Sequence, residues 1–238
     1  MADLLLNTYV MNIPTSVQRL ADFASDYPAC LPSATVWQAL TGNEVTPPSW
    51  WQASRNNYAI GVNFRNILLH EQTKNENKCV MIFEDDVVFV EDFESRYNAF
   101  LEGLAENSLE DFDMLYLGGG HVGVFLPELV TPSILRCHNI WAPHAVIVKP
   151  TAFQTIIDAL SDATPWACEH RHECRLGELM QLGQLKVYAP LDQMAGQRGG
   201  IPSDNAHFTR EHDEYFPRFD YVDLNHVIVS HGQSEEEA

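Results

Sequence analysis

The sequence predicts an α/β fold in which a mostly parallel sheet is flanked by helices. Apolar runs typical of buried strands alternate along the chain with segments whose apolar residues recur at helical spacing. The 238 residues are enough to bury a single core, and a composition of 45% hydrophobic residues with 13 Gly and 13 Pro is that of a globular protein. In folds of this class, ligands bind beyond the carboxyl ends of the strands.

The first elements predict a β-α-β unit. Residues 4–11 form an apolar run that predicts a buried strand. Thr15 and Ser16 follow as candidates for a helix N-cap, and Pro28 lies just after the predicted helix. Residues 34–37 predict the second strand.

The same alternation continues to the end of the chain. The clearest strand is residues 79–83, which are continuously apolar, as expected for a strand covered on both faces. The other predicted elements are helices at 59–70, up to 104, and at 151–160, and strands at 112–117, 141–148 and 185–189.

The chain is predicted to be one domain over residues 1–233, because no internal repeat or linker interrupts it. Residues 234–238, a short acidic run, are predicted to be a mobile tail. No run of about 18 apolar residues and no secretory signal is found, so we expect a cytoplasmic protein without a membrane span. The five scattered cysteines are predicted to be incidental buried thiols.

The net charge disfavours one class of partner. With 14 Lys and Arg against 33 Asp and Glu, the chain carries a formal charge of −19. An acidic surface repels phosphate backbones unless basic residues gather in one groove, so nucleic acid is disfavoured without being excluded.

Three adjacent carboxylates follow the apolar run: Glu84, Asp85 and Asp86. Their mutual repulsion requires a cation or full solvation. In an extended segment Glu84 and Asp86 would point to the same side, and such oxygen ligands suit Mg²⁺ or Mn²⁺, which keep positions open for a diphosphate. The alternative is a solvated strand end that caps a helix.

Several segments carry a family resemblance. The two most specific are FEDDV at 83–87 and DFDMLYLG at 111–118. The remaining segments are the opening strand with Asn12 and Arg19, ALTG at 39–42, PHAVIV at 143–148 with Ala152, and APL at 189–191 with Gln193 or Gln197 and then Ser203-Asp204-Asn205. In this order and spacing, the chain resembles glycosyltransferase family 25, the group of lipopolysaccharide-biosynthesis and collagen galactosyltransferases.

The resemblance implies a GT-A type nucleotide-sugar-binding fold and a divalent metal at the acidic motif. It further implies transfer of a hexose, with inversion, from a nucleotide-diphosphate sugar such as a UDP-hexose to an acceptor hydroxyl. The residues expected to act are Glu84 and Asp86 at the metal, Asp113 near donor or acceptor, and Asn12, Arg19, Asp85 and Gly118 at the nucleotide sugar. GT-A enzymes often complete the metal site from the C-terminal segment, which makes His207 or His231 a candidate ligand.

Two further candidates come from the residues themselves. Arg198 is one of few cations available to bind a diphosphate. The glycine-rich segments around Gly118 and Arg198 lack the spacing of dinucleotide or Walker loops, so dehydrogenases and kinases lose support. Trp50 and Trp51 pack in the core or line an acceptor groove.

An inverting transferase also needs a general base. The family's aspartate should lie within residues 166–180, where this chain has none, so we expect Glu173 or Glu169 to substitute, with Glu173 preferred because it lies just before a helix signal. The same segment supports another interpretation, because Cys168, His170, His172 and Cys174 are the ligand types of a structural zinc site.

The departures from the family pattern motivate rival functions. Asn63 and Phe64 stand where serine and histidine are usual, which would suit a catalytically lapsed, carbohydrate-binding protein. A metallohydrolase could use the acidic triplet with His170 and His172. A glycan is the most expected acceptor, and a hydroxymethylated DNA base is the alternative that the net charge disfavours.

Overall fold

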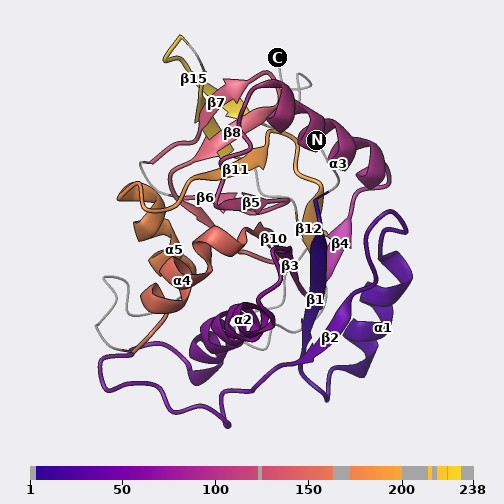
Figure 1. Cartoon of the computed structure of the whole chain (residues 1–238), viewed down its shortest axis with the longest axis vertical. Coiled ribbons are helices and arrows are strands. Elements are labelled where there is room, and N and C mark those ends of the chain that lie inside the picture. The colour runs from indigo at the N-terminus through magenta and orange to yellow at the C-terminus, as the bar shows by residue number, and fades with distance from the viewer. Residues whose placement is uncertain are drawn as a thin grey trace.

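The fold is a mixed α/β architecture built on one large twisted sheet (Figure 1). This computed structural model describes residues 4–122, 125–162, 172–199, 214–215, 219–223 and 225–231. Within these residues, the order of the ten strands in the sheet is β15 (Ile228–His231), β14 (Phe219–Val222), β7 (Glu128–Thr131), β8 (Ile134–Cys137), β11 (Val187–Pro190), β5 (Met114–Tyr116), β10 (Ala145–Val148), β3 (Cys79–Glu84), β1 (Leu6–Asn12) and β2 (Thr35–Gln38).

The predicted mostly parallel sheet is confirmed, and a few of its described strands run antiparallel to the rest. Every antiparallel pairing in this sheet involves β15, β8 or β10, and the remaining strands all run in one direction. Because β10 lies between β3 and β5, it brings its amino end to the edge where those strands end. Two small sheets, β13 (Glu214–Tyr215) with β12 (Ala195–Arg198) and β4 (Val87–Phe89), and β6 (Gly120–His121) with β9 (Ile140–Trp141), lie beside it.

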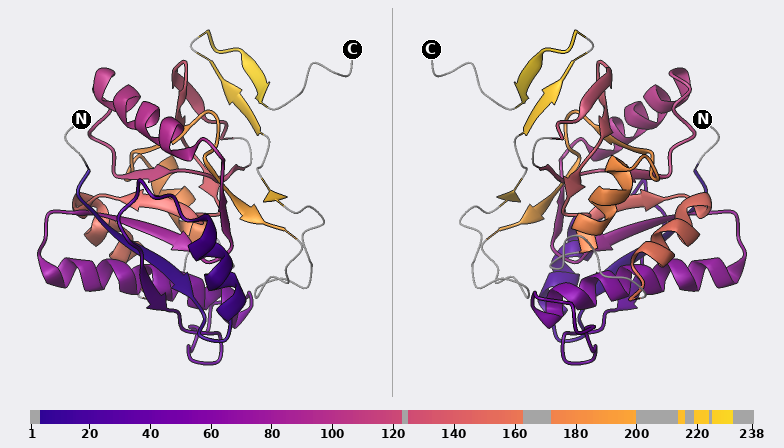
Figure 2. Two further views of the ribbon diagram at one scale, coloured as in Figure 1. Left: turned by 90° about the vertical axis from the view of Figure 1, so that its right-hand side faces the viewer. Right: turned by 90° about the vertical axis from the view of Figure 1, so that its left-hand side faces the viewer.

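Helices cover both faces of the sheet (Figure 2). On one face lie α2 (Arg55–Lys74), α4 (Pro150–Ala159) and α5 (His172–Gln181), and on the other lie α1 (Val17–Asp26) and α3 (Phe93–Glu106). Alternate residues of β3 enter the two cores: Val80 and Ile82 pack with the first group of helices, Met81 and Phe83 with the second. This arrangement confirms that the continuously apolar run is a strand buried on both sides.

The structure differs from the sequence prediction in one strand and in the burial of one cysteine. The strand expected over 141–148 is broken, because β9 ends at Trp141 and Ala142 adopts a left-handed conformation with φ of 57° before β10 begins. The prediction of buried thiols is wrong for Cys30, which is exposed, whereas Cys79, Cys137 and Cys174 are buried. No helix among the described residues is long and apolar enough to cross a membrane.

Candidate functional site

The candidate site lies at the carboxyl edge of the central strands. β1 ends at Asn12, and its Met11 is in register with Glu84, the last residue of β3. The first residue of β10, Ala145, is in register with Phe83, so the segment before β10 reaches the same edge. Side chains that are far apart in sequence therefore meet here, as expected for an α/β fold.

The acidic motif forms a turn. β3 ends at Glu84, and Asp85 and Asp86 form the turn into β4. The expected extended geometry, with Glu84 and Asp86 on one side and Asp85 opposite, is therefore wrong. The chain turns because β4 pairs with β12, with Val87 opposite Gln197. We call Glu84, Asp85 and Asp86 the acidic turn.

Asp85 is the buried member of the acidic turn, with 5% of its surface exposed. The Nδ2 of Asn12 donates a hydrogen bond to its Oδ2 at 2.7 Å, and the Arg19 guanidinium forms an ion pair with its Oδ1. The same guanidinium lies 3.6 Å from Oδ2 of Asp86. The structure thus brings together Asn12, Arg19 and Asp85, three of the residues expected to bind the nucleotide sugar, and in it they bind one another.

Glu84 has the most perturbed environment of the turn. The Nε2 of Gln197 donates to its Oε2 at 3.2 Å, and the Glu84 backbone N–H donates to the His144 carbonyl at 2.9 Å. The pKa of Glu84 is raised to about 8, mainly by burial and in addition by the charges of Asp86, Glu173 and Asp85, while Arg19 lowers it. The burial of this carboxyl and the neighbouring negative charges therefore both disfavour its ionised form.

Glu173 reaches this edge from the first turn of α5 and is 8% exposed. Its Oε2 accepts the Ala142 N–H at 3.1 Å, and the Ala142 carbonyl accepts the His144 N–H at 2.8 Å. Glu173 therefore stabilises the break between β9 and β10. We call Glu84, Asp85, Asp86 and Glu173 the acidic cluster. Among the described residues, Arg19 is the cation that lowers the pKa of Glu84.

Gly118 is required by close packing. A Cβ at this position would lie 1.8 Å from the Ala195 carbonyl oxygen and 2.8 Å from Nε2 of His144. β12 consequently lies directly against the end of β5, with the His144 ring 3.3 Å from the Ala195 oxygen. The neighbouring Gly119 carbonyl accepts a hydrogen bond from Nε2 of Gln193 at 2.7 Å. Gln193 and Gln197, left as alternatives by the sequence, thus have different contacts. A contact of Gly118 with the nucleotide sugar stays a prediction.

The side chain of Arg198 contacts α1, whereas its backbone contacts the acidic turn. Its guanidinium forms an ion pair with Asp26 at the end of α1, while its backbone N–H donates to the Asp86 carbonyl at 2.7 Å. Sequence reasoning missed Asp26, because 172 residues separate it from Arg198 and no local signal links them.

Asp113 lies at the opposite edge of the sheet from the acidic turn. It precedes β5, and its Oδ2 accepts the Lys186 N–H at 2.8 Å. Through Val148 of β10, Met114 lies level with Val80, so Asp113 is at the amino edge. At about 3.3 Å per residue, that is roughly 16 Å along the strands from Glu84. Asp113 therefore does not belong to the acidic cluster.

The remaining predicted residues divide into two groups. Those outside the described residues are His207, Cys168, Glu169, His170 and the Ser203–Asn205 segment. Asn63 and Phe64 are core residues: the Asn63 amide bonds the Leu40 backbone through both its oxygen and its nitrogen, at 2.9 Å each, and Phe64 is fully buried. His172 is buried with its ring centroid 6.0 Å from that of Phe64. Asn63, Phe64 and His172 thus have a packing role.

Across the part of the chain that the structure describes, no three His, Cys, Asp or Glu side chains form a group that could hold a metal ion by themselves. The acidic turn offers carboxylate oxygens from Glu84 and Asp86 only, since Asp85 is held by Asn12 and Arg19. A cation at this turn would therefore need ligands from substrate or water.

Comparisons with known proteins leave the family open. No protein-family model and no curated protein matches the chain. Among solved structures, it is similar to a protein described as A197 from STIV, with a TM-score of 0.44 and 10% identity over 97% of this chain and 95% of that one. It is also similar to UDP-glucose pyrophosphorylase in complex with UDP-glucose, with a TM-score of 0.43 and 10% identity over 80% of this chain and 91% of that one. Similarities of this strength identify neither family nor activity.

Proposed function

We propose that the chain is a metal-dependent glycosyltransferase that moves a hexose from a nucleotide-diphosphate sugar to an acceptor hydroxyl with inversion. The observation that supports it most is the acidic cluster: four carboxylates, two of which face Arg19, at the sheet edge where α/β proteins bind ligands. The resemblance of FEDDV and DFDMLYLG to family 25 supports the choice of reaction.

The donor atoms of the turn suit a hard divalent cation. Mg²⁺ and Mn²⁺ are commonly held by one or two carboxylates together with substrate phosphates and water. Glu84 and Asp86 would hold the ion, and the neighbouring carboxylates that, after burial, help raise the pKa of Glu84 would favour a cation there. When bound, such an ion stabilises the charge that develops on the departing diphosphate.

The protein groups have separate tasks in this proposal. Asp85 and Asn12 orient Arg19, whose guanidinium also faces Asp86 and can contact a phosphate oxygen. Glu173, held by the Ala142 N–H, is the general base that accepts the proton of the attacking hydroxyl. The donor we propose is a UDP-hexose and the acceptor a glycan, since the net charge of −19 disfavours nucleic acid.

The test is a panel of nucleotide sugars incubated with Mn²⁺, scored by thermal shift and by release of nucleoside diphosphate. We expect one donor to raise the melting temperature and to be slowly hydrolysed without acceptor, both effects being lost on chelation. Cleavage of simple phosphate esters instead would favour a metallohydrolase. Stabilisation by saccharides with no nucleotide-sugar turnover would favour a lapsed, carbohydrate-binding protein.

A further inference from the structure

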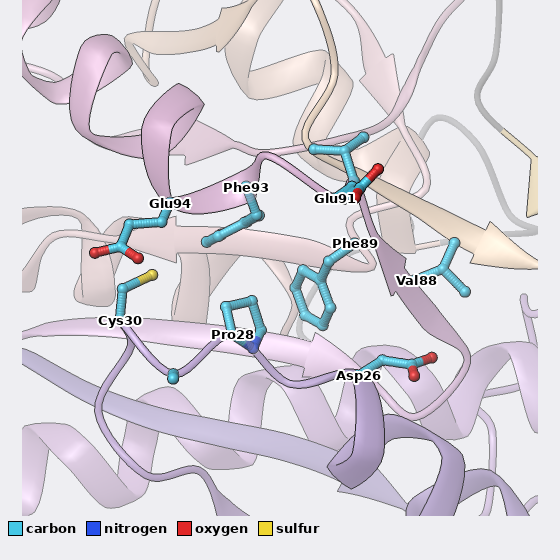
Figure 3. Close-up of a pocket in the computed structure, with 10 residues that line it drawn as sticks. Asp26, Pro28, Cys30, Val88, Phe89, Glu91, Phe93 and Glu94 are labelled. Atoms are coloured by element: carbon cyan, nitrogen blue, oxygen red, sulfur yellow. The ribbon is translucent and has the colours of Figure 1, made fainter.

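A groove lies between the end of α1 and the start of α3, on the side of β4 (Figure 3). Its volume is about 440 Å³, enough for a few side chains of a partner. In Figure 3, Pro28 and Phe89 lie in the middle of the groove, Glu94 at one end and Asp26 at the other.

The floor of the groove is apolar and rigid. The Phe89 ring packs against Phe83, Phe93 and Phe23 with centroid distances of 5.4, 5.2 and 6.1 Å. These contacts fix the ring in place while it stays half-buried, so it can still meet a ligand. A fixed aromatic ring beside carboxylates is a favourable environment for an alkyl cation, through both cation–π attraction and apolar contact with the alkyl stem.

The rim of the groove is acidic. Among the described residues that line it, Asp26, Glu91 and Glu94 are acidic and none is Lys, Arg or His. Asp26 is paired with Arg198, whereas Glu91 and Glu94 are exposed and form no ion pair with any residue that the structure describes. The contact between Arg198 and Asp26 shows that this wall already accepts the cationic side chain of one protein segment.

We propose that this groove docks a basic peptide segment of a partner protein, with a lysine or arginine stem over Phe89 and the basic groups of the segment facing Glu91 and Glu94. The charge of the lining is complementary to such a segment, and the aromatic floor gives its alkyl stem an apolar surface. The proposal does not depend on the glycosyltransferase activity, because none of the three residues belongs to the acidic cluster.

The test measures binding of a fluorescent peptide, acetyl-Lys-Leu-Lys-Ala-Lys-amide, by polarisation at physiological ionic strength. We expect saturable binding to the wild type, and a fivefold to tenfold weaker affinity for the double variant Glu91→Gln/Glu94→Gln, about the effect of removing two exposed ion pairs. The matched control is Glu102→Gln/Glu106→Gln, which removes the same charge from exposed positions of α3 outside the groove and should change affinity less than twofold.

A second set of measurements tests the contribution of Phe89 and whether the lysine charges of the peptide are required. Phe89→Leu should weaken binding severalfold, and a peptide with acetylated lysines should not bind. Equal losses in the two double variants would reveal attraction to the overall negative charge and overturn the proposal. Absence of saturable binding, or spermidine binding as tightly as the peptide, would also overturn it. The glutamate variants lie on the surface, so the test does not rely on the stability of the Phe89 variant.

Discussion

The carboxylates at the two edges of the central sheet have different neighbours. At the amino edge, Glu71 accepts hydrogen bonds from Lys74 at 2.6 Å, Asn7 at 2.7 Å and Tyr9, and Asp113 accepts the Lys186 N–H. At the carboxyl edge, Glu84 lies near three other carboxylates, and Arg19 pairs with one of them, Asp85, and lies 3.6 Å from another, Asp86.

The pKa shifts follow this difference in pairing. Burial alone would raise the pKa of Glu71, but the hydrogen bonds from Lys74, Tyr9 and Asn7 outweigh it, and the pKa is lowered. The pKa of Glu84 is raised to about 8, mainly by burial, and the neighbouring carboxylates add to the shift instead of opposing it. Carboxylates that lie together in this way favour the binding of a cation, whereas an acid paired with a lysine stabilises the fold.

The largest expected effect is that of Asp86→Asn at the carboxyl edge. Because a metal contributes several kcal/mol of transition-state stabilisation, loss of one of its two protein carboxylates should lower transfer about 10³-fold. Initial rates at saturating Mn²⁺ measure it. Asp113→Asn at the amino edge is the matched control, and its asparagine oxygen can still accept the Lys186 N–H, so its rate should change less than threefold. Similar losses in both variants would remove the distinction between the edges.

Glu173→Gln should give the next largest effect. Loss of a general base lowers the rate about 10²-fold or more, while the donor still binds, because the diphosphate is held elsewhere. A glutamine oxygen can still accept the Ala142 N–H, so the fold should persist. Glu178→Gln on the same helix, which loses only its ion pair with Arg175, is the control. Full activity of the Glu173 variant would redirect the search for the base to residues outside the described part.

The contributions of Glu84 and Glu71 to stability should change in opposite directions as the pH rises. The pKa of Glu84 is raised on folding, so the metal-free folded state binds the extra proton between about pH 4.5 and 8 and loses stability as pH rises through this window. The slope is at most about 1.4 kcal/mol per pH unit. The difference in the free energy of unfolding between the wild type and Glu84→Gln, measured with denaturant at several pH values, isolates the contribution of Glu84. Added Mn²⁺ should reverse its change with pH.

Glu71→Gln provides the counterpart to this measurement. The folded-state pKa of Glu71 is lowered, so its contribution is present above the ordinary carboxyl pKa of about 4.3 and is lost as pH falls through the folded value. The stability difference between the wild type and this variant should therefore shrink on acidification. If the stability contributions of Glu71 and Glu84 changed in the same direction with pH, the opposite pKa shifts assigned to the two edges would be contradicted.

The smallest effect is expected for the exposed pair of Asp111 and Lys186 at the amino edge. The hydrogen bond from Lys186 lowers the pKa of Asp111, yet both side chains are largely solvated and screened. Asp111→Asn should cost less than about 1 kcal/mol of stability and leave activity unchanged. Thermal unfolding and initial rates measure both, and a large loss of activity would show that the amino edge contributes to the site.

Some of this protein could be predicted from the sequence because the signal is local. The strand at 79–83 follows from an unbroken apolar run, and the helix expected over 59–70 follows from apolar residues at helical spacing. The structure begins that helix earlier, after Ser54, whose Oγ accepts the Asn57 N–H at 3.2 Å, whereas Ser16, a cap candidate from the sequence, makes no such hydrogen bond. The acidic motif at the end of that strand was visible for the same reason. Periodicity and caps act over a few residues, so one sequence is enough to show them.

Only the tertiary structure decided which side chains meet. The turn at Asp85 and Asp86 is set by the pairing of β4 with β12, more than 100 residues away, and local periodicity wrongly predicted an extended segment there. The edge of the sheet on which Asp113 lies is set by strand direction, which an apolar run does not encode. The sequence by itself therefore determined the elements and the chemistry of the acidic motif, while long-range pairing decided that Arg19 and Glu173 join it and Asp113 does not, because packing couples residues without regard to their separation along the chain.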